Sequence, residues 1–306
     1  MAGELLAITG ATGFVGQAVL EYAARAGIEV RALARRPQEA RAGVEWVQGD
    51  LSDRRALQRL VGKASVVLNI AGVVNAPDPQ GFEDGNVWGT LNVVNAALEA
   101  GVPRFVHVSS LSAREPELSV YGKSKLRGEK VVKASSLDWT VVRPPAVYGP
   151  RDTEMFELFK LAQRGIVPLP PQGHLSLIHV SDLARLLLAL IPGSEDVTHL
   201  TFEPDDGTPG GWTNTALAKA IGVAVGKRVT ALNLPEKVLR WGASLDARFR
   251  GDGAKLTLDR VGYMCHPDWR VGEGNQPPPA LWTPQVETQM GLHATAAWYR
   301  EAGWLK

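Results

Sequence analysis

An apolar run near the N-terminus leads into three closely spaced glycines, the last of which lies inside the helical pattern that follows. The apolar run is Leu5 to Ile8, and the helical pattern starts at Val15. Glycine permits positive φ and lets the backbone approach a ligand closely. The start of a helix presents free N–H groups and a partial positive charge to an anion. The order strand, glycine turn, helix therefore predicts a cradle for a pyrophosphate. Its residues are Gly10, Thr12, Gly13, Phe14, Val15 and Gly16.

The bulk composition is that of an ordinary soluble globule, with 306 residues, 45% apolar and 21% charged. A net charge of +1 gives no electrostatic reason to expect nucleic acid or an anionic membrane as a partner. The single Cys265 excludes an internal disulfide and suits a reducing compartment. No apolar run is long enough to span a membrane, and the N-terminus has no export-signal pattern. We therefore expect a cytoplasmic protein without membrane insertion.

The first half of the chain alternates strand and helix patterns. Strands are expected at 4–9, 28–34, 44–47, 65–71, 104–109 and 138–143, with helices at 14–26, 53–61, 82–100 and 119–135. Such alternation predicts an α/β fold, a doubly wound parallel sheet of the Rossmann type with helices on both faces. The strands read as near-continuous apolar runs, as expected when both faces of a sheet are covered.

The alternation stops after Gly149-Pro150. We therefore expect a dinucleotide-binding domain at 1–150 and a smaller substrate-binding lobe at 151–306, some of whose strands rejoin the first sheet. Within the lobe, helices are expected at 153–164, 181–191, 212–222, 236–247 and 285–301, and strands at 175–178, 198–203 and 228–233. The span 248–284 has no clear pattern.

The end of the second expected strand carries Arg35 and Arg36. Folds that bind NAD usually place an acidic residue there for the ribose 2′-hydroxyl, and none is present. The guanidinium groups instead suit the 2′-phosphate of NADP, so NADP is favoured over NAD, although surface arginines at a strand end remain an alternative. Two further strand ends offer contacts to the same ligand. Asp50 and Leu51 follow the third strand, where Asp50 could instead cap the next helix, and Ala71 and Gly72 follow the fourth.

Tyr121 and Lys125 are four residues apart on an expected helix, so both project from one face. A cation about 4 Å from the phenol, at an effective dielectric of about 20, favours the phenolate by roughly 4 kcal/mol, or about 3 pKa units before the lysine is desolvated. This would bring the phenol near working pH as a general acid or base. Ser110 ends the fifth expected strand and could hold a substrate oxygen beside Tyr121; Ser109 and Ser112 are rivals for that role.

These motifs, in this order, resemble the short-chain dehydrogenase/reductase superfamily, and within it the extended branch of the NAD-dependent epimerase/dehydratase type. The matching segments are 9–16, 86–92, 143–150 and 178–182, with a closing group at 282–303. The resemblance implies that Ser110, Tyr121 and Lys125 are catalytic and that Asn86 orders the site. It also implies that Ser109, Tyr121 and Lys125 touch the cofactor, that Pro144, Ala146 and Val147 border the nicotinamide, and that His179 is structural.

Two departures bear on the substrate. Nucleotide-sugar enzymes of the branch often carry Asn where this chain has Ala146, and they often have a longer loop than the one between Ser110 and Tyr121. A proline directly after Arg143 makes the segment more similar to that of ketone and steroid reductases. It is also similar to that of the accessory subunit of respiratory complex I. We therefore expect an oxidoreductase that transfers a hydride between the nicotinamide and a small, fairly apolar carbonyl or alcohol. A nucleotide-sugar epimerase or dehydratase with tightly bound NAD, and a non-catalytic NADP(H)-binding sensor or assembly module, are the alternatives.

Several residues of the second half and of the loops after the expected strands are candidates to line the substrate site. Candidate lining residues are Val73, Val74, Ser112, Arg151, Met155, Phe156, Leu169 and His174. No partner at metal-ligand spacing accompanies His174, so no metal site is predicted. Relatives often pair through the helices matching 82–100 and 119–135, which by analogy would make the chain a homodimer.

Overall fold

The computed structural model describes residues 5–254 and 256–306, which form two compact units. Unit 1 consists of residues 5–144, 183–203 and 275–283. Unit 2 consists of 145–182, 204–254, 256–274 and 284–306. The first division thus falls at Pro144, before the expected boundary after Pro150, and two later segments belong to unit 1. Within the described ranges, no helix has the length and apolarity needed to cross a membrane.

Unit 1 is built on one seven-stranded sheet with the order β11-β6-β5-β4-β1-β2-β3, in which every pairing is parallel. Its strands are β1 (Leu5–Thr9), β2 (Glu29–Ala34), β3 (Val44–Gln48), β4 (Val66–Asn69), β5 (Arg104–Val108), β6 (Asp138–Val142) and β11 (Leu200–Phe202). The order reverses between β1 and β4, so the carboxyl ends of these two strands flank the crevice where ligands bind in such sheets. The expected doubly wound parallel sheet is confirmed.

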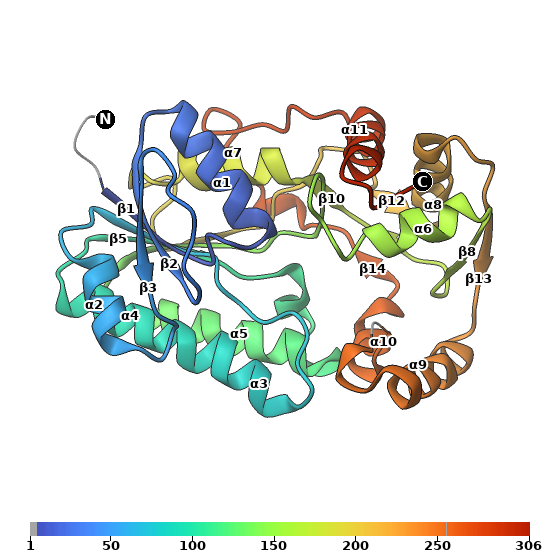
Figure 1. Ribbon diagram of the computed structural model, residues 1–306, viewed down its shortest axis with the longest axis horizontal. Coiled ribbons are helices and arrows are strands. Elements are labelled where there is room, and N and C mark those ends of the chain that lie inside the picture. The colour runs from blue at the N-terminus through green and yellow to red at the C-terminus, as the bar shows by residue number, and fades with distance from the viewer. Residues whose placement is uncertain (1–4, 255) are drawn as a thin grey trace. The chain divides into compact units, whose positions relative to one another are not determined.

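Helices cover both faces of this sheet (Figure 1). The helices of unit 1 are α1 (Phe14–Arg25), α2 (Arg54–Val61), α3 (Pro79–Glu83), α4 (Gly89–Glu99), α5 (Val120–Lys133) and the greater part of α7 (Val180–Ala189). The main core lies between the sheet and α2, α4 and α5, where Phe105, Leu57 and Val93 are fully or almost fully buried. A close-packed core of this kind keeps the strand ends rigid, and the residues that follow them are therefore held in fixed positions.

The helix expected over 82–100 is divided into three pieces. A π-helical turn, Asp84–Trp88, separates α3 from α4. Two glycines of this stretch pack where a side chain would clash: a Cβ at Gly85 would lie 2.3 Å from Cγ2 of Val73, and one at Gly89 would lie 2.6 Å from Cδ1 of Leu51. π-Turns are rare and often occur at functional sites, and this one contains Asn86.

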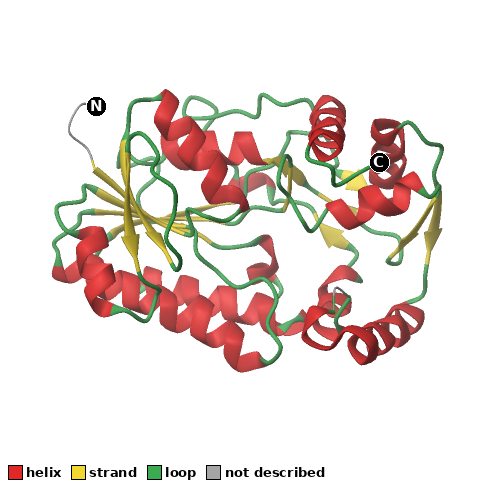
Figure 2. Ribbon diagram, in the orientation of Figure 1, coloured by secondary structure: helices red, strands yellow, loops and turns green. Residues whose placement is uncertain are grey.

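Unit 2 combines helices with three small sheets (Figure 2), of strand orders β10-β7, β12-β9-β14 and β13-β8. Its strands are β7 (Ala146–Tyr148), β8 (Ile166–Leu169), β9 (His174–Leu175), β10 (Leu177–His179), β12 (Trp212–Thr213), β13 (Thr230–Asn233) and β14 (Asp268–Trp269). Its helices are α6 (Phe156–Gln163), α8 (Asn214–Val225), α9 (Glu236–Arg250), α10 (Leu258–Met264) and α11 (Thr288–Glu301). The stretch without a clear sequence pattern contains α10 and β14.

An aromatic core holds the helices of unit 2 together. The buried Tyr299 ring lies 5.1 Å from the ring of Phe159 and 4.9 Å from that of Phe156, and its hydroxyl donates to the carbonyl of Asp152. Met155 and Leu169 belong to the same cluster. Three of the candidate substrate-lining residues, Met155, Phe156 and Leu169, are therefore part of a packed core.

Candidate active site

The glycine turn after β1 is packed so closely that side chains are excluded from it. Gly10 has φ +73°, and a Cβ there would lie 2.7 Å from the backbone nitrogen of Ala71. A Cβ at Gly16 would lie 2.2 Å from the carbonyl oxygen of Gly10. The turn is closed by the N–H of Gly13, which donates to the same oxygen at 3.0 Å. The glycines thus bring the start of α1 against the end of β4.

The first turn of α1 has the properties of an anion site. Its N-cap is Gly13, no side chain caps it, and no acidic residue lies in the first turn. The leading N–H groups of a helix, here those of Phe14, Val15 and Gly16, have no intrahelical partner. Thr12 beside them is exposed. Together with the helix dipole, this arrangement fits a pyrophosphate.

We expect Gly16→Ala to damage this cradle. The added methyl group would meet the Gly10 carbonyl at 2.2 Å, so backbone must move, at a cost of about 1–3 kcal/mol in folding free energy. NADPH affinity should fall with it, as measured by isothermal titration calorimetry. The matched control is Gly274→Ala, because a Cβ at Gly274 meets nothing within 4 Å. Equal NADPH affinity in the two variants would contradict the cradle.

A buried chain of hydrogen bonds links the ends of three neighbouring strands. The hydroxyl of Thr9 on β1 donates to Oδ1 of Asn69 on β4 at 2.6 Å, and Nδ2 of Asn69 lies 3.1 Å from Nδ1 of His107 on β5. Burial lowers the pKa of His107 to about 3, so its ring is neutral. The N–H of Ala71 donates to the Thr9 hydroxyl at 3.2 Å. These hydrogen bonds hold the ends of β1, β4 and β5 together, and they fix the start of the loop that contains Ala71 and Gly72.

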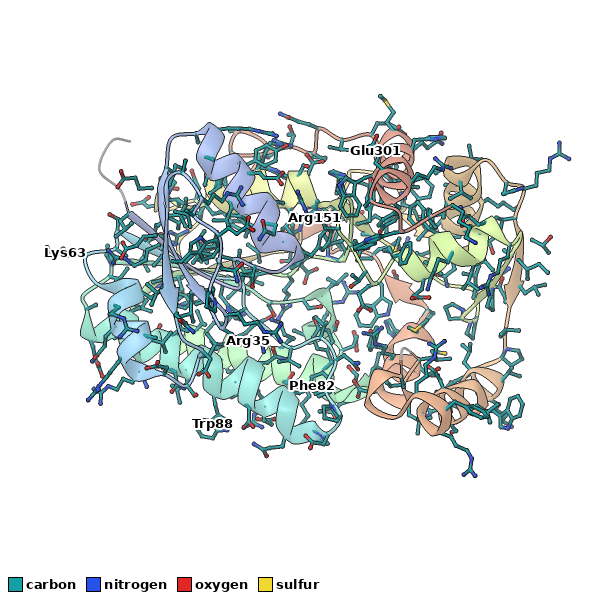
Figure 3. All side chains as sticks on the ribbon, viewed as in Figure 1. Arg35, Lys63, Phe82, Trp88, Arg151 and Glu301 are labelled. Carbon is teal, nitrogen blue, oxygen red and sulfur yellow. The ribbon has the colours of Figure 1, made fainter. Side chains whose placement is uncertain are left out.

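Arg35 and Arg36 follow β2 and are exposed (Figure 3 labels Arg35). Asp50 follows β3, and its Oδ1 accepts bonds from the hydroxyl and N–H of Ser52. The bonds from Ser52 lower the pKa of Asp50, and the charge of Arg35 acts in the same direction. The helix cap is another residue, since Asp53 accepts from the N–H of Ala56 at the start of α2.

Leu51 contributes packing as well as backbone. Its side chain packs against the main core, and its carbonyl accepts from Nδ2 of Asn92 at 2.8 Å. It also fills the space left by Gly89.

Lys125 and Asn86 meet at Gly72, just after the end of β4. A Cβ at Gly72 would lie 3.0 Å from Oδ1 of Asn86 and 3.3 Å from Nζ of Lys125. Asn86 is held by the N–H and carbonyl of Val73 and by the hydroxyl of Ser124, at 2.8, 2.9 and 2.9 Å. An ammonium and an amide thus face the strand end where a dinucleotide would pass in this fold.

Lys125 is almost fully buried, at 5% exposure, and its Nζ donates to the carbonyl of Val108 at 2.9 Å. Burial lowers its pKa to about 8, an effect that the nearby carboxylate of Glu129 opposes. The lysine therefore titrates within the range where an enzyme works.

Tyr121 lies in the first turn of α5, one turn before Lys125, and is half-buried. Its ring packs against Phe82 of α3 at 6.2 Å between centroids (Figure 3 labels Phe82). Its carbonyl accepts from the hydroxyl of Ser124, the residue that also holds Asn86. Unit 1 thus links the tyrosine, lysine and asparagine of the sequence prediction.

The serines after β5 differ in their surroundings. Ser109 is buried, and its hydroxyl donates to Glu129 at 2.6 Å. Ser110 is half-buried and caps a 3-10 turn, where its Oγ lies 2.8 Å from Oγ of Ser112. The N–H of Leu111 donates to the carbonyl of Pro144, which joins this turn to the end of β6.

A buried ionic cluster adjoins this site. Glu129 and Glu203 have fully buried side chains, and Arg143 bridges them. Arg143 forms two bonds of 2.8 Å to the carboxylate of Glu129 and one of 3.2 Å to that of Glu203. Lys133 adds a bond of 3.2 Å to Glu129, and Arg114 lies 3.7 Å from Glu203. Burial opposes ionisation of Glu129, but the bonds from Arg143 and Ser109 outweigh it and lower the pKa.

Sequence reasoning did not identify His107, Glu129 or Glu203. One local signal was available: Glu129 follows Lys125 by four residues, so both lie on one face of α5. Glu203 lies beyond β11, and nothing local indicates that β11 pairs with β6.

The remaining predicted residues are divided between the two units. Val73 and Val74 follow Gly72 in unit 1, and Val74 is exposed. The others belong to unit 2. Ala146 and Val147 lie on β7, Arg151 stacks over Trp298, His174 is exposed on β9, and the ring of buried His179 lies 5.2 Å from that of Tyr148.

Curated relatives include both an enzyme and subunits of a larger assembly. The ceramide reductase of Caulobacter vibrioides is 37% identical over 314 aligned positions, which cover 98% of this chain and 96% of that protein. The mitochondrial NADH dehydrogenase [ubiquinone] 1 alpha subcomplex subunit 9 of Dictyostelium discoideum is 29% identical, over 63% of this chain and 57% of that protein.

Solved structures show the same fold at lower identity. MoeE5 in complex with UDP-glucose and NAD matches with a TM-score of 0.75 at 22% identity, covering 98% of this chain and 99% of that one. The model of the NAD dependent epimerase/dehydratase family matches residues 6–200. These findings confirm the resemblance drawn from the motifs: the chain belongs to the NAD-dependent epimerase/dehydratase family of extended short-chain dehydrogenases/reductases.

Proposed function

We propose that the chain is an NADP(H)-dependent reductase of an apolar carbonyl compound, with Tyr121 as its proton donor. The observation that carries this proposal is the meeting of Lys125 and Asn86 at Gly72, in the unit that also holds the uncapped start of α1. The reductase relative, at 37% identity over nearly the whole chain, supports the same reaction class.

The chemistry assigns one task to each group. When bound, the nicotinamide supplies the hydride that goes to the carbonyl carbon. Tyr121 gives its hydroxyl proton to the carbonyl oxygen, and Ser110 donates a hydrogen bond to that oxygen. The ammonium of Lys125 favours the phenolate left on Tyr121. Asn86 fixes the loop after β4 through its bonds to Val73. Oxidation of the alcohol runs through the same groups in reverse.

The relative's name directs the choice of substrate. Ceramide is a lipid, so ketones with long acyl or alkyl chains are the first class to test on this chain. Turnover is followed by the absorbance of the reduced nicotinamide, with detergent-dispersed lipid ketones beside short ketones. UDP-sugars are added in parallel as thermal-shift ligands, because a nucleotide-sugar enzyme would be stabilised by them. NADPH consumption with a ketone supports the proposal, and stabilisation by UDP-sugars without ketone turnover would contradict it.

For cofactor choice, we expect the double change Arg35→Ala and Arg36→Ala to raise the Kd of NADPH by about 10- to 100-fold. Charge-assisted hydrogen bonds contribute about 1.5–3 kcal/mol, and about 1.4 kcal/mol corresponds to tenfold in Kd. NADH binding should change little, because NADH lacks the 2′-phosphate. Arg25→Ala, at the far end of α1, is the control. Equal losses for NADPH and NADH would show that the arginines do not read the 2′-phosphate.

A second function is a dinucleotide-binding module without turnover. The resemblance to subunits of mitochondrial NADH dehydrogenase favours it. It predicts firm NADPH binding with no ketone reduced across the whole panel.

A further inference from the structure

Within the described part of the chain, the buried side chains of helix α9 in unit 2 lie on one face. Leu239 and Ala243 are buried and form a small cluster with Val261 of α10. Figure 1 shows α9 beside α10. The buried face of α9 therefore packs against α10.

The opposite face of α9 is apolar and exposed. Val238 is 44% exposed, Trp241 67% and Phe249 82%. Leu245 is half-buried between them. Positions 238, 241, 245 and 249 are spaced by three or four residues, so they line one side of the helix. We call these four residues the α9 stripe. Figure 3 shows side chains extending from the outer side of α9 into open space.

Basic residues accompany the stripe. Arg240 pairs with Glu236 and Arg250 with Asp246 along the helix, at 2.7 and 3.2 Å. Lys237 and Arg248 are exposed and form no ion pair within the described part of the chain. They precede Trp241 by four residues and follow it by seven, which places both on its side of the helix.

The local charge differs from that of the whole chain. Four basic residues against two acidic ones give α9 a net charge of +2, although the chain as a whole carries +1. Other strongly exposed apolar side chains of unit 2, such as Val223 on α8 and Met290 on α11, occur singly on their helices. The α9 stripe is therefore distinguished by its continuity and by its flanking cations.

We infer that α9 docks unit 2 onto the surface of an anionic lipid bilayer. Tryptophan and phenylalanine on one side of a helix, with lysine and arginine beside them, match helices that lie in the membrane interface. The apolar rings enter the headgroup region, and Lys237 and Arg248 meet lipid phosphates. The helix lies on the bilayer and does not cross it. This interaction goes beyond the proposed function and does not depend on it.

The test uses the full chain and sedimentation with vesicles. The chain should pellet with vesicles of phosphatidylcholine plus phosphatidylglycerol and remain in solution with phosphatidylcholine alone, and salt should release it. The double change Trp241→Ser and Phe249→Ser should lower partitioning at least about tenfold. The double change Lys237→Glu and Arg248→Glu should lower it by about fivefold per residue or more.

The matched control is the double change Val223→Ser and Met290→Ser, which removes two other strongly exposed apolar side chains from the same unit. Its partitioning should equal that of the unchanged chain. The inference is overturned if the unchanged chain ignores anionic vesicles, or if stripe and control variants partition equally. It is also overturned if the unchanged chain is a dimer by analytical ultracentrifugation and only the stripe variant is a monomer, since a second copy would then cover the stripe.

Discussion

Tyr121→Phe should lower kcat by about 100- to 10,000-fold, the range typical for loss of a general acid. The substitution removes one hydroxyl and keeps the ring that packs against Phe82. NADPH affinity, measured by fluorescence titration, should stay within a few-fold, because the cradle at α1 is unchanged. The large loss in turnover should therefore come without a loss in binding.

Tyr22→Phe provides the control for Tyr121. Tyr22 is also half-buried in unit 1, lies on α1, and has its ring beside the guanidinium of Arg25. Its variant should retain full turnover. If Tyr121→Phe kept most of its activity, the proton would have to come from another group and the proposed mechanism would fail. A loss of NADPH affinity that matched the loss of kcat would point to a binding role instead.

Glu129→Ala should destabilise the fold by about 3–5 kcal/mol, the usual cost of removing one member of a buried ion pair. The carboxylate is fully buried and accepts bonds from Arg143, Ser109 and Lys133. Its removal leaves the Arg143 guanidinium with only Glu203 as a carboxylate partner in the cluster. Urea unfolding of the chain measures the difference directly.

The effect of Glu129 should depend on pH in a defined direction. Its pKa is lower in the folded chain than the ordinary value of 4.5, so its stabilising contribution is present above pH 4.5 and is lost as the pH falls through the folded value. The difference in free energy of unfolding between the unchanged chain and Glu129→Ala should therefore become smaller as the pH falls below 4.5. Arg54→Ala, which breaks an exposed pair with Glu99, should cost less than about 1 kcal/mol. Equal costs for the two variants would contradict the account of the cluster.

The parts of this structure that could be predicted are those that depend on residues close together in the sequence. Gly10 and Gly13 lie between an apolar run and a helical pattern, which is enough to indicate a strand, a glycine turn and a helix in that order. The spacing of Tyr121 and Lys125 places them on one face of α5. The alternation of strands and helices gave the parallel sheet, because few topologies satisfy it.

The parts that escaped prediction depend on contacts between distant segments. Some later strands were expected to rejoin the first sheet, but no local pattern indicates that β11 adds next to β6, which is the pairing that brings Glu203 to Arg143. The π-turn around Asn86 arises where Gly85 and Gly89 pack against Val73 and Leu51, so its register is set by tertiary contact. The exposure of Trp241 is similar, since only the packing of α9 on α10 decides which face remains open.

The return of the chain to unit 1 has a practical consequence for dissecting the protein. Each unit consists of three segments, and segments of the two units alternate along the sequence. The backbone therefore passes between the units five times. A fragment that stopped near residue 150 would lack β11 and leave β6 with an unpaired row of N–H and C=O groups. Such open edges recruit other chains. A fragment made by removing the second half at a single point should therefore aggregate through the edge of β6. A minimal dinucleotide-binding fragment would have to include β11 as well.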